Sequence, residues 1–301
     1  MSVTGINIKY VYLPYLAVSL GTILIYTLLS YTLYIELEAL TLKDDIRLFW
    51  ILVAFPWIPV LIWLRRRIRF LRVSGNRGRG YFGYQILMAM SITITIGLIQ
   101  RYIERGSFDL ITIDSIAEID NYPSEKYFQI NSFMVNNYSV PSHVLASATG
   151  EYEGSLTYHL YLACPFQDAG NVWYGIGYSK RLDNRLSNPE KEAIYKRFIE
   201  SAERSFKQYA FTDVSYFEKL GYSDDRDAYM LAIKKVYPGA DEAEQVILIP
   251  NQAAFEDRLG TTLPWIFGSF AIGAFVMFFM VVVPRVDEEE WRAFKNIVPR
   301  G

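Results

Sequence analysis

The chain has 301 residues, of which 51% are hydrophobic and 21% are charged, and its formal net charge is −2. This composition is too polar for a protein made only of membrane helices and too apolar for an ordinary soluble protein. The single cysteine, Cys164, excludes an intramolecular disulfide. No cluster of Cys and His has the spacing of metal ligands, so neither a metal nor another cofactor is predicted.

The charges are divided along the chain. Residues 102–262 hold 15 Lys and Arg against 24 Asp and Glu, a net charge of −9, which leaves a net charge of +7 on the remainder. An acidic middle with basic flanks indicates two electrostatic environments. It argues against nucleic acid as a partner, since that would favour a single basic surface.

The first two apolar segments are predicted to be membrane helices. The segment of about 11–35 exceeds the roughly 20 residues that cross a bilayer, and tyrosines flank it at both ends. Its length and the absence of a basic start favour a membrane helix over a cleaved signal peptide. The second segment, 48–64, contains Pro56 and Pro59, which predict a kinked helix.

Seven arginines follow the second span, and they orient the chain. The loop 65–82 is predicted to be cytoplasmic because short loops rich in Lys and Arg stay on that side of the membrane. The first five arginines are also candidate contacts for anionic lipid headgroups. The seven are Arg65, Arg66, Arg67, Arg69, Arg72, Arg77 and Arg79.

Two further spans are predicted, and each carries small residues on one face. The third span is about 83–100, with Ser91 and Thr95 four residues apart. The fourth is 263–284, with Ser269 and Gly273 as a small-xxx-small pair. Such residues let helices pack closely in a membrane. The alternatives are a substrate path along Ser91 and Thr95 and a homodimer seam along Ser269 and Gly273.

The cytoplasmic arginine loop determines the predicted topology. Residues 1–101 contain the first three spans, and residues 102–262 are then extracytoplasmic. The fourth span returns the chain to the cytoplasm, so both termini lie inside and 285–301 is a cytoplasmic tail. Acidic residues in the loop 36–47 and basic residues in the tail agree with this orientation in a cytoplasmic (inner) membrane.

The segment 102–262 is predicted to be an α+β domain, since it is long enough for its own core and contains several runs of β-branched and aromatic residues. A helix is predicted from Asn188, taken as the cap, to about residue 209, and a second helix at 224–237. The predicted strands are 108–114, 126–135, 143–149, 156–163, 172–178 and 245–249.

Few residues in this domain suggest chemistry. His143 or His159 could act as a base beside a serine or Cys164, but structural histidines and a buried thiol are the simpler interpretation. The run Asp224-Asp225-Arg226-Asp227 lacks the glycine and distal glutamate of a calcium loop, so it predicts the start of a helix.

One resemblance covers nearly the whole chain. The stretches VYLPYLAVSLGTILIYTLL, FPWIPVLIWLR, NRLSNPEKEAIYKRF and LPWIFGSFAIGAF resemble the N-terminal region of a bacterial group of rhomboid-family membrane proteins. In that group, a four-helix region with an extracytoplasmic insert precedes the six-helix protease core. The serine of the family's G-x-S-G motif and its membrane histidine have no counterpart here, so the resemblance implies no catalytic residue.

The expected fold is therefore a four-helix membrane protein with an α+β extracytoplasmic domain inserted between the third and fourth helices. The expected function is that of a non-catalytic accessory or recognition module, part of or companion to a rhomboid-type protease. Its expected partners are membrane lipids and a membrane protein, either as a binding partner or as a substrate, with a homo-oligomer as a further option. The alternative is a sensor or assembly subunit whose outer domain binds a ligand or protein. A hydrolase built on Cys164 or a histidine is a third hypothesis.

Overall fold

The structure is a computed structural model. Its description covers four stretches of the chain: residues 3–36, 51–72, 77–149 and 154–297.

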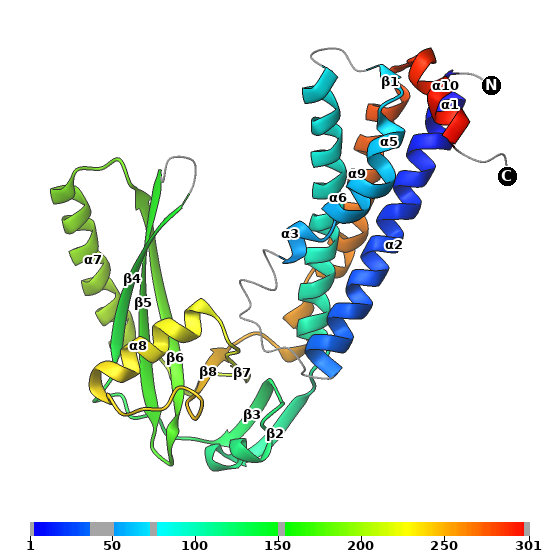
Figure 1. Cartoon of the computed structure of the whole chain (residues 1–301). Coiled ribbons are helices and arrows are strands. Elements are labelled where there is room, and N and C mark those ends of the chain that lie inside the picture. Colours follow the sequence, from blue (N-terminus) through cyan, green and yellow to red (C-terminus); the bar gives the residue numbers. More distant parts are fainter. Residues whose placement is uncertain (1–2, 37–50, 73–76, 150–153, 298–301) are drawn as a thin grey trace. The chain divides into compact units, whose positions relative to one another are not determined.

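The chain forms two compact units, and the colours of Figure 1 give the residue numbers of each. The first is helical and comprises Met1–Ser107 with Leu259–Gly301, and the second comprises Phe108–Arg258. The chain enters the second unit after helix α6 (Arg77–Gly106) and leaves it before helix α9 (Thr262–Val282). The second unit is therefore inserted between two helices of the first.

The helical unit contains three helical stretches long and apolar enough to cross a membrane within the described residues: Val3–Leu33, Gly80–Gly106 and Phe255–Val282. The other segments of this unit are short. The elements are α1 (Val3–Asn7), η1 (Ile8–Tyr12), α2 (Leu13–Ser30), η2 (Tyr31–Glu36), α3 (Leu52–Ala54), α4 (Trp57–Pro59), η4 (Val60–Leu64), α5 (Arg65–Ile68), α6, α9 and α10 (Glu288–Ile297).

In its described part, the predicted second span, 48–64, is a helix interrupted by a turn at residues 55–56. Its described part is divided into α3, α4 and η4, and residues 48–50 lie outside the described residues. Pro56 and Pro59 account for the breaks because proline removes a backbone donor and its ring clashes with the preceding turn. The four-helix bundle is thus not confirmed, and three candidate spans remain.

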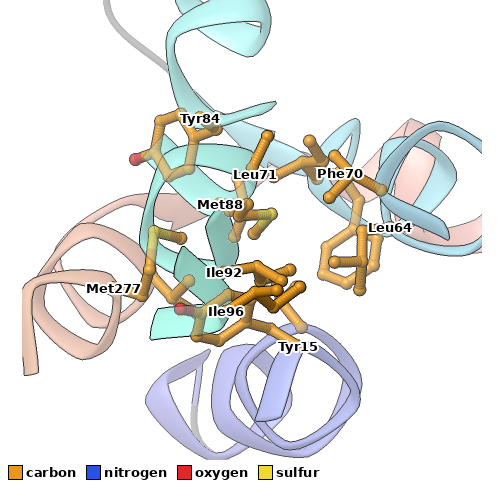
Figure 2. Close-up of a cluster of buried hydrophobic side chains, with 14 of the residues drawn as sticks. Tyr15, Leu64, Phe70, Leu71, Tyr84, Met88, Ile92, Ile96 and Met277 are labelled. Carbon is orange, nitrogen blue, oxygen red and sulfur yellow. The ribbon is translucent and has the colours of Figure 1, made fainter. Parts of the chain in front are cut away.

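Helix α6 lies at the centre of the helical core. Its side chains Met88, Ile92 and Ile96 are fully or almost fully buried. Figure 2 shows them with Tyr15 of α2 on one side and Met277 of α9 on another. Because protein interiors are densely packed, this arrangement allows little change of side-chain volume along α6.

The outer faces of the three long helices are apolar as well. Exposed side chains include Leu24 and Leu28 of α2, Ile94 of α6, and Phe267 and Phe275 of α9. Monomeric soluble proteins rarely expose such continuous apolar surface. A helix that is apolar on all sides is typical of a membrane span, whose outer face contacts lipid.

Polar side chains connect the helices inside the bundle. Ser30 donates to the Oε1 atom of Gln100 at 2.6 Å, and Tyr84 donates to the carbonyl oxygen of Met280 at 2.6 Å. Asn7 donates to the carbonyl oxygens of Val281 and Pro284 at 3.0 and 2.9 Å. Each such bond contributes roughly 1 kcal/mol within a membrane, so the bundle has specific as well as apolar contacts.

One end of the bundle joins segments that are distant in sequence. Strand β1 (Leu71–Arg72) pairs antiparallel with β9 (Arg285–Val286), which follows α9 directly. Helix α10 adds Trp291, whose ring lies 4.8 Å from that of Tyr10 and 5.1 Å from that of Phe70. The described arginines of α5 and β1, the residues after α9 and helix α1 therefore lie at the same end of this unit (Figure 1).

The second unit is built on one mixed sheet. Within the described residues, seven strands lie in the order β2-β3-β7-β8-β6-β5-β4. The pairs β2–β3 and β6–β8 are parallel and the others antiparallel. The strands are β2 (Leu110–Ser115), β3 (Tyr127–Ser132), β4 (Ser142–Thr149), β5 (Ser155–Phe166), β6 (Ala169–Asp183), β7 (Tyr216–Lys219) and β8 (Val246–Asn251).

A helix covers each face of this sheet. Leu160, Leu162 and Cys164 of β5 pack in the same cluster as Phe198 and Ala202 of helix α7 (Asn188–Lys207). The alternate residues of β5 face helix α8 (Asp224–Val236), because successive side chains of a strand point to opposite faces. The unit therefore has an α+β fold with two separate hydrophobic cores.

The start of α7 differs by one residue from the prediction. The cap is Ser187, not Asn188. The Ser187 backbone N–H donates to the Glu190 carboxylate at 2.9 Å, and the Ser187 hydroxyl donates to the same carboxylate at 2.7 Å. A Ser followed three residues later by a Glu is the sequence pattern of a capping box. Its two reciprocal hydrogen bonds favour Ser187 over Asn188 as the cap of this helix.

Candidate functional site

The four small residues predicted to pack helices, Ser91, Thr95, Ser269 and Gly273, meet between α6 and α9. The hydroxyl oxygens of Thr95 and Ser269 lie 3.2 Å apart, and the Tyr15 hydroxyl oxygen lies 2.7 Å from that of Ser91. A Cβ atom added to Gly273 would lie only 2.7 Å from the Cβ atom of Ser91. This seam thus brings two backbones close together, and its hydroxyls have partners within the unit.

A shallow groove runs along the outside of this seam. It has a volume of about 440 Å³ and is lined mostly by apolar side chains of α6 and α9, including Met90, Ile94, Trp265 and Ile272. Ser91, Ser269 and Gly273 also border it. A groove of this composition suits an acyl chain or the side chains of another membrane helix.

The arginines predicted to contact lipid headgroups lie at the end of the bundle that carries β1 and α10. Arg65, Arg66, Arg69 and Arg72 are exposed there. Arg67 is half-buried: its Nη1 atom donates to the carbonyl oxygen of Tyr10 at 3.2 Å, and its guanidinium lies 5.7 Å from the centre of the Phe294 ring. Four arginines are therefore accessible, whereas Arg67 contacts both η1, through Tyr10, and α10, through Phe294.

Cys164 and the two histidines lie on opposite faces of the sheet. Cys164 belongs to the core beneath α7. His143 lies directly across from Tyr161, and the ring of His159 stacks on that of Tyr161 at 6.2 Å, so both histidines share the α8 face. A thiol cannot transfer a proton to an imidazole through a sheet. The structure therefore contradicts the hypothesis of a Cys164–histidine pair.

Burial also suppresses the reactivity of this thiol. Cys164 has no exposed surface, and desolvation raises the pKa of its thiol to about 12. We predict that an alkylating reagent at pH 8 modifies Cys164 in the folded chain roughly a thousandfold more slowly than in the denatured chain, because the thiolate is the reactive form. Mass spectrometry of timed samples measures both rates, and equal rates would contradict the burial.

The acidic run at Asp224 begins a helix. Ser223 accepts a hydrogen bond from the Arg226 backbone N–H at 3.3 Å, and Asp225 accepts one from the Tyr161 hydroxyl at 2.7 Å. Within the described residues, no group of three or more His, Cys, Asp or Glu side chains is placed to hold a metal ion. These carboxylates interact favourably with the helix dipole.

A larger groove lies between α7 and β6, and the sequence did not predict it. We call it the α7–β6 groove. Strand β6 contributes residues 178–183, and α7 contributes Ile194, Arg197, Phe198, Ser201, Ala202 and Ser205. Its volume is about 690 Å³, which lies within the roughly 300–1,000 Å³ of small-molecule sites.

One residue that lines the α7–β6 groove, Tyr178, has an unpaired hydroxyl. The Tyr178 oxygen is buried and has no hydrogen-bond partner among the described residues. Burial also raises the pKa of this phenol, so at neutral pH it keeps its proton and remains a donor. A buried polar group without a partner costs roughly 1–3 kcal/mol and requires an explanation.

Three cations border the same groove. Lys180, Arg181 and Arg197 line it, and none of them forms an ion pair with a described residue. The Nε atom of Arg197 donates to the carbonyl oxygen of Ala193 at 3.3 Å. The lining carboxylate, Asp183, accepts a hydrogen bond from the Arg185 backbone N–H at 2.9 Å. The groove thus has a local positive charge within a domain that is acidic as a whole.

No protein-family model, curated protein or solved structure matches this chain. The functional conclusion therefore depends on the geometry of the two units.

Proposed function

We propose that this protein is a non-catalytic, membrane-anchored recognition module. The observation that carries the proposal is the α7–β6 groove, which has a volume of about 690 Å³ and an unpaired buried hydroxyl in a unit inserted between two membrane-length helices. The groove contains hydrogen-bond donors and apolar surface but no Cys, His or paired carboxylates among its described lining residues. This composition favours binding over covalent or acid–base chemistry.

We further propose that the helical unit lies in the cytoplasmic membrane with both termini inside and residues 102–262 outside. The pairing of β1 with β9 supports this orientation, because it holds the arginine loop and the residues after α9 at the same end of the bundle. The exposed arginines Arg65, Arg66, Arg69 and Arg72 then face anionic headgroups at the cytoplasmic surface.

For the membrane partner, we propose a rhomboid-type protease core, in line with the resemblance of the sequence. The groove along the α6–α9 seam supports this part of the proposal, since apolar surface beside small residues is the kind that membrane helices pack against. Disulfide trapping between a cysteine at Met90 and the helices of a co-expressed rhomboid core tests it, with a cysteine at Leu24 of α2 as the control.

A second candidate function is sensing, and the position of the inserted unit favours it. The unit is connected to α6 at one end and to α9 at the other, and these two helices pack directly through Ser91 and Gly273. A ligand that prefers one arrangement of the inserted unit can shift the equilibrium of the helices only if its affinity differs between the two arrangements.

A photo-reactive residue in the groove tests the proposed function. The full chain carries p-benzoylphenylalanine at Ser201, which lines the groove, and a second variant carries it at Tyr138, which is 96% exposed. Irradiation in membranes of the cells that make the protein should give an adduct of one defined mass at position 201 only. Absence of that adduct, or the same products at both positions, would contradict the recognition function.

A further inference from the structure

We propose that the α7–β6 groove binds a small anionic amphiphile, that is, a molecule with one apolar chain or ring and a carboxylate or phosphate head. This inference rests on the proposed recognition function, because it names the ligand class of that same groove. Three independent features of the groove carry it: its apolar wall, its cations and its unpaired phenol.

The apolar wall of the groove suits a hydrocarbon body. Leu182 of β6 and Phe198 and Ala202 of α7 are buried at the edge of the core beneath α7, and Ile194 extends the same face of the helix. These three α7 residues recur at intervals of four, so they lie on one stripe of the helix. A ligand body against this stripe removes apolar surface from water, which is the main driving force for such binding.

The cations are placed for an anionic head. Lys180 follows Tyr178 by two residues on β6, so both side chains point to the α7 face. Arg197 lies on α7 one turn before Ser201, which also lines the groove. Charge-assisted hydrogen bonds from these groups to a carboxylate or phosphate are about twice as strong as neutral ones. Asp183 is the carboxylate among the described lining residues, whereas Glu200 and Glu203 do not line the groove.

The Tyr178 phenol favours a ligand that also carries a hydrogen-bond acceptor. Its hydroxyl is buried and has no hydrogen-bond partner among the described residues, and Tyr178 is one of the residues that line the groove. A ligand oxygen in that position would satisfy it. A purely apolar ligand would leave this donor unpaired, and a cationic ligand would be repelled by Lys180 and Arg197.

The test uses the full chain in nanodiscs of neutral lipid and two photo-reactive probes. One probe is a diazirine-bearing undecanoate, and the other is the matching undecanol without the charge. Peptide mapping reports where each probe reacts. We expect saturable labelling of residues 178–186 and 194–205 by the acid, and about tenfold less by the alcohol. Competition with dodecanoate or with dodecyl phosphate then distinguishes a carboxylate from a phosphate head.

Three variants connect the labelling to named residues. The double variant Lys180→Gln/Arg197→Gln should lower the affinity for the acid about tenfold. The control is Arg204→Gln, because Arg204 lies on the same helix and its Nε atom donates to a helix carbonyl as that of Arg197 does, yet it does not line the groove. Tyr178→Phe should lower the affinity about threefold without lowering the thermal stability, since the hydroxyl has no partner to lose among the described residues.

The outcomes separate the ligand class from the proposed function. Equal labelling by the acid and the alcohol, or labelling confined to α6 and α9, would overturn the inference of an anionic amphiphile. If the benzophenone at position 201 still gives a defined adduct, the recognition function stands with another ligand class. If both probes fail at the groove and the benzophenone gives no adduct, both proposals are wrong.

Discussion

Replacement of Gly273 with valine is expected to lower the free energy of unfolding of the helical unit by about 2–3 kcal/mol. The added Cβ atom would lie 2.7 Å from the Cβ atom of Ser91 and 3.8 Å from its Cα atom. Side chains at a packed helix seam have little room to move, so the helices must separate or rotate. Loss of helical ellipticity during thermal unfolding in nanodiscs measures the change.

The chain offers both a control and a rescue for this variant. A Cβ atom added to Gly83 of α6 would have no heavy atom of another described residue within 4 Å, so Gly83→Val should have a much smaller effect. Gly273→Ala should be less destabilising in a Ser91→Gly background than in the wild-type chain, because that background lacks the close Cβ–Cβ contact. If Gly273→Val and Gly83→Val were equally stable, the close α6–α9 seam would be wrong.

Replacement of Phe217 with alanine should destabilise the inserted unit by about 3–5 kcal/mol. Phe217 is 1% exposed at the centre of the core beneath α7, and its ring lies 5.2 Å from Phe133 and 5.6 Å from Tyr174. Truncation leaves a cavity that neighbouring strands can fill only in part. Hydrogen exchange of the full chain, resolved by mass spectrometry into peptides, measures the loss of protection.

The exposed Tyr138 is the matched aromatic control, and Tyr138→Ala should change protection by less than about 0.5 kcal/mol. Because the two units have separate cores, Phe217→Ala should weaken protection in β3, β6 and β7 and leave that of α6 and α9 unchanged. Equal loss of protection in both units would show that they unfold together, contrary to the two-unit description.

The local pattern of the sequence predicted most of the sheet but not strand β7. Each of the six predicted strands overlaps an observed strand, because β-branched and aromatic residues dominate these runs. Strand β7 has only four residues, 216–219, and it pairs with β3 and β8, which are distant in sequence. A run of that length has no readable period, so its partners determine its structure.

In the helical unit, too, the sequence predicts the long elements better than the short ones. Hydropathy predicts α2, α6 and α9 well because a membrane span needs many consecutive apolar residues. It also predicts an apolar segment at 48–64, but it cannot say how Pro56 and Pro59 divide that segment. The charges of the tail do not predict helix α10, and its apolar side shows only in the three-residue spacing of Trp291 and Phe294.

The candidate sites differ in how far the sequence reveals them. The small residues Ser91, Thr95, Ser269 and Gly273 stand out at helical spacing, and the structure brings them together. The α7–β6 groove has no motif. The groove is the space left between β6 and α7 when the unit folds. Neither the periodicity nor the composition of the sequence predicts how much space remains between a strand and the helix that follows it.

The most direct test of an extracytoplasmic recognition module is a measurement of the side of the membrane on which the inserted unit lies. Cys164 is buried, so the wild-type chain is a silent background for a membrane-impermeant maleimide. In sealed cells, Ser201→Cys should be labelled without lysis, whereas Arg66→Cys should be labelled only after lysis, since Ser201 lines the groove and Arg66 is exposed in the arginine loop. Labelling of Arg66→Cys in sealed cells, with Ser201→Cys protected until lysis, would contradict the proposed function.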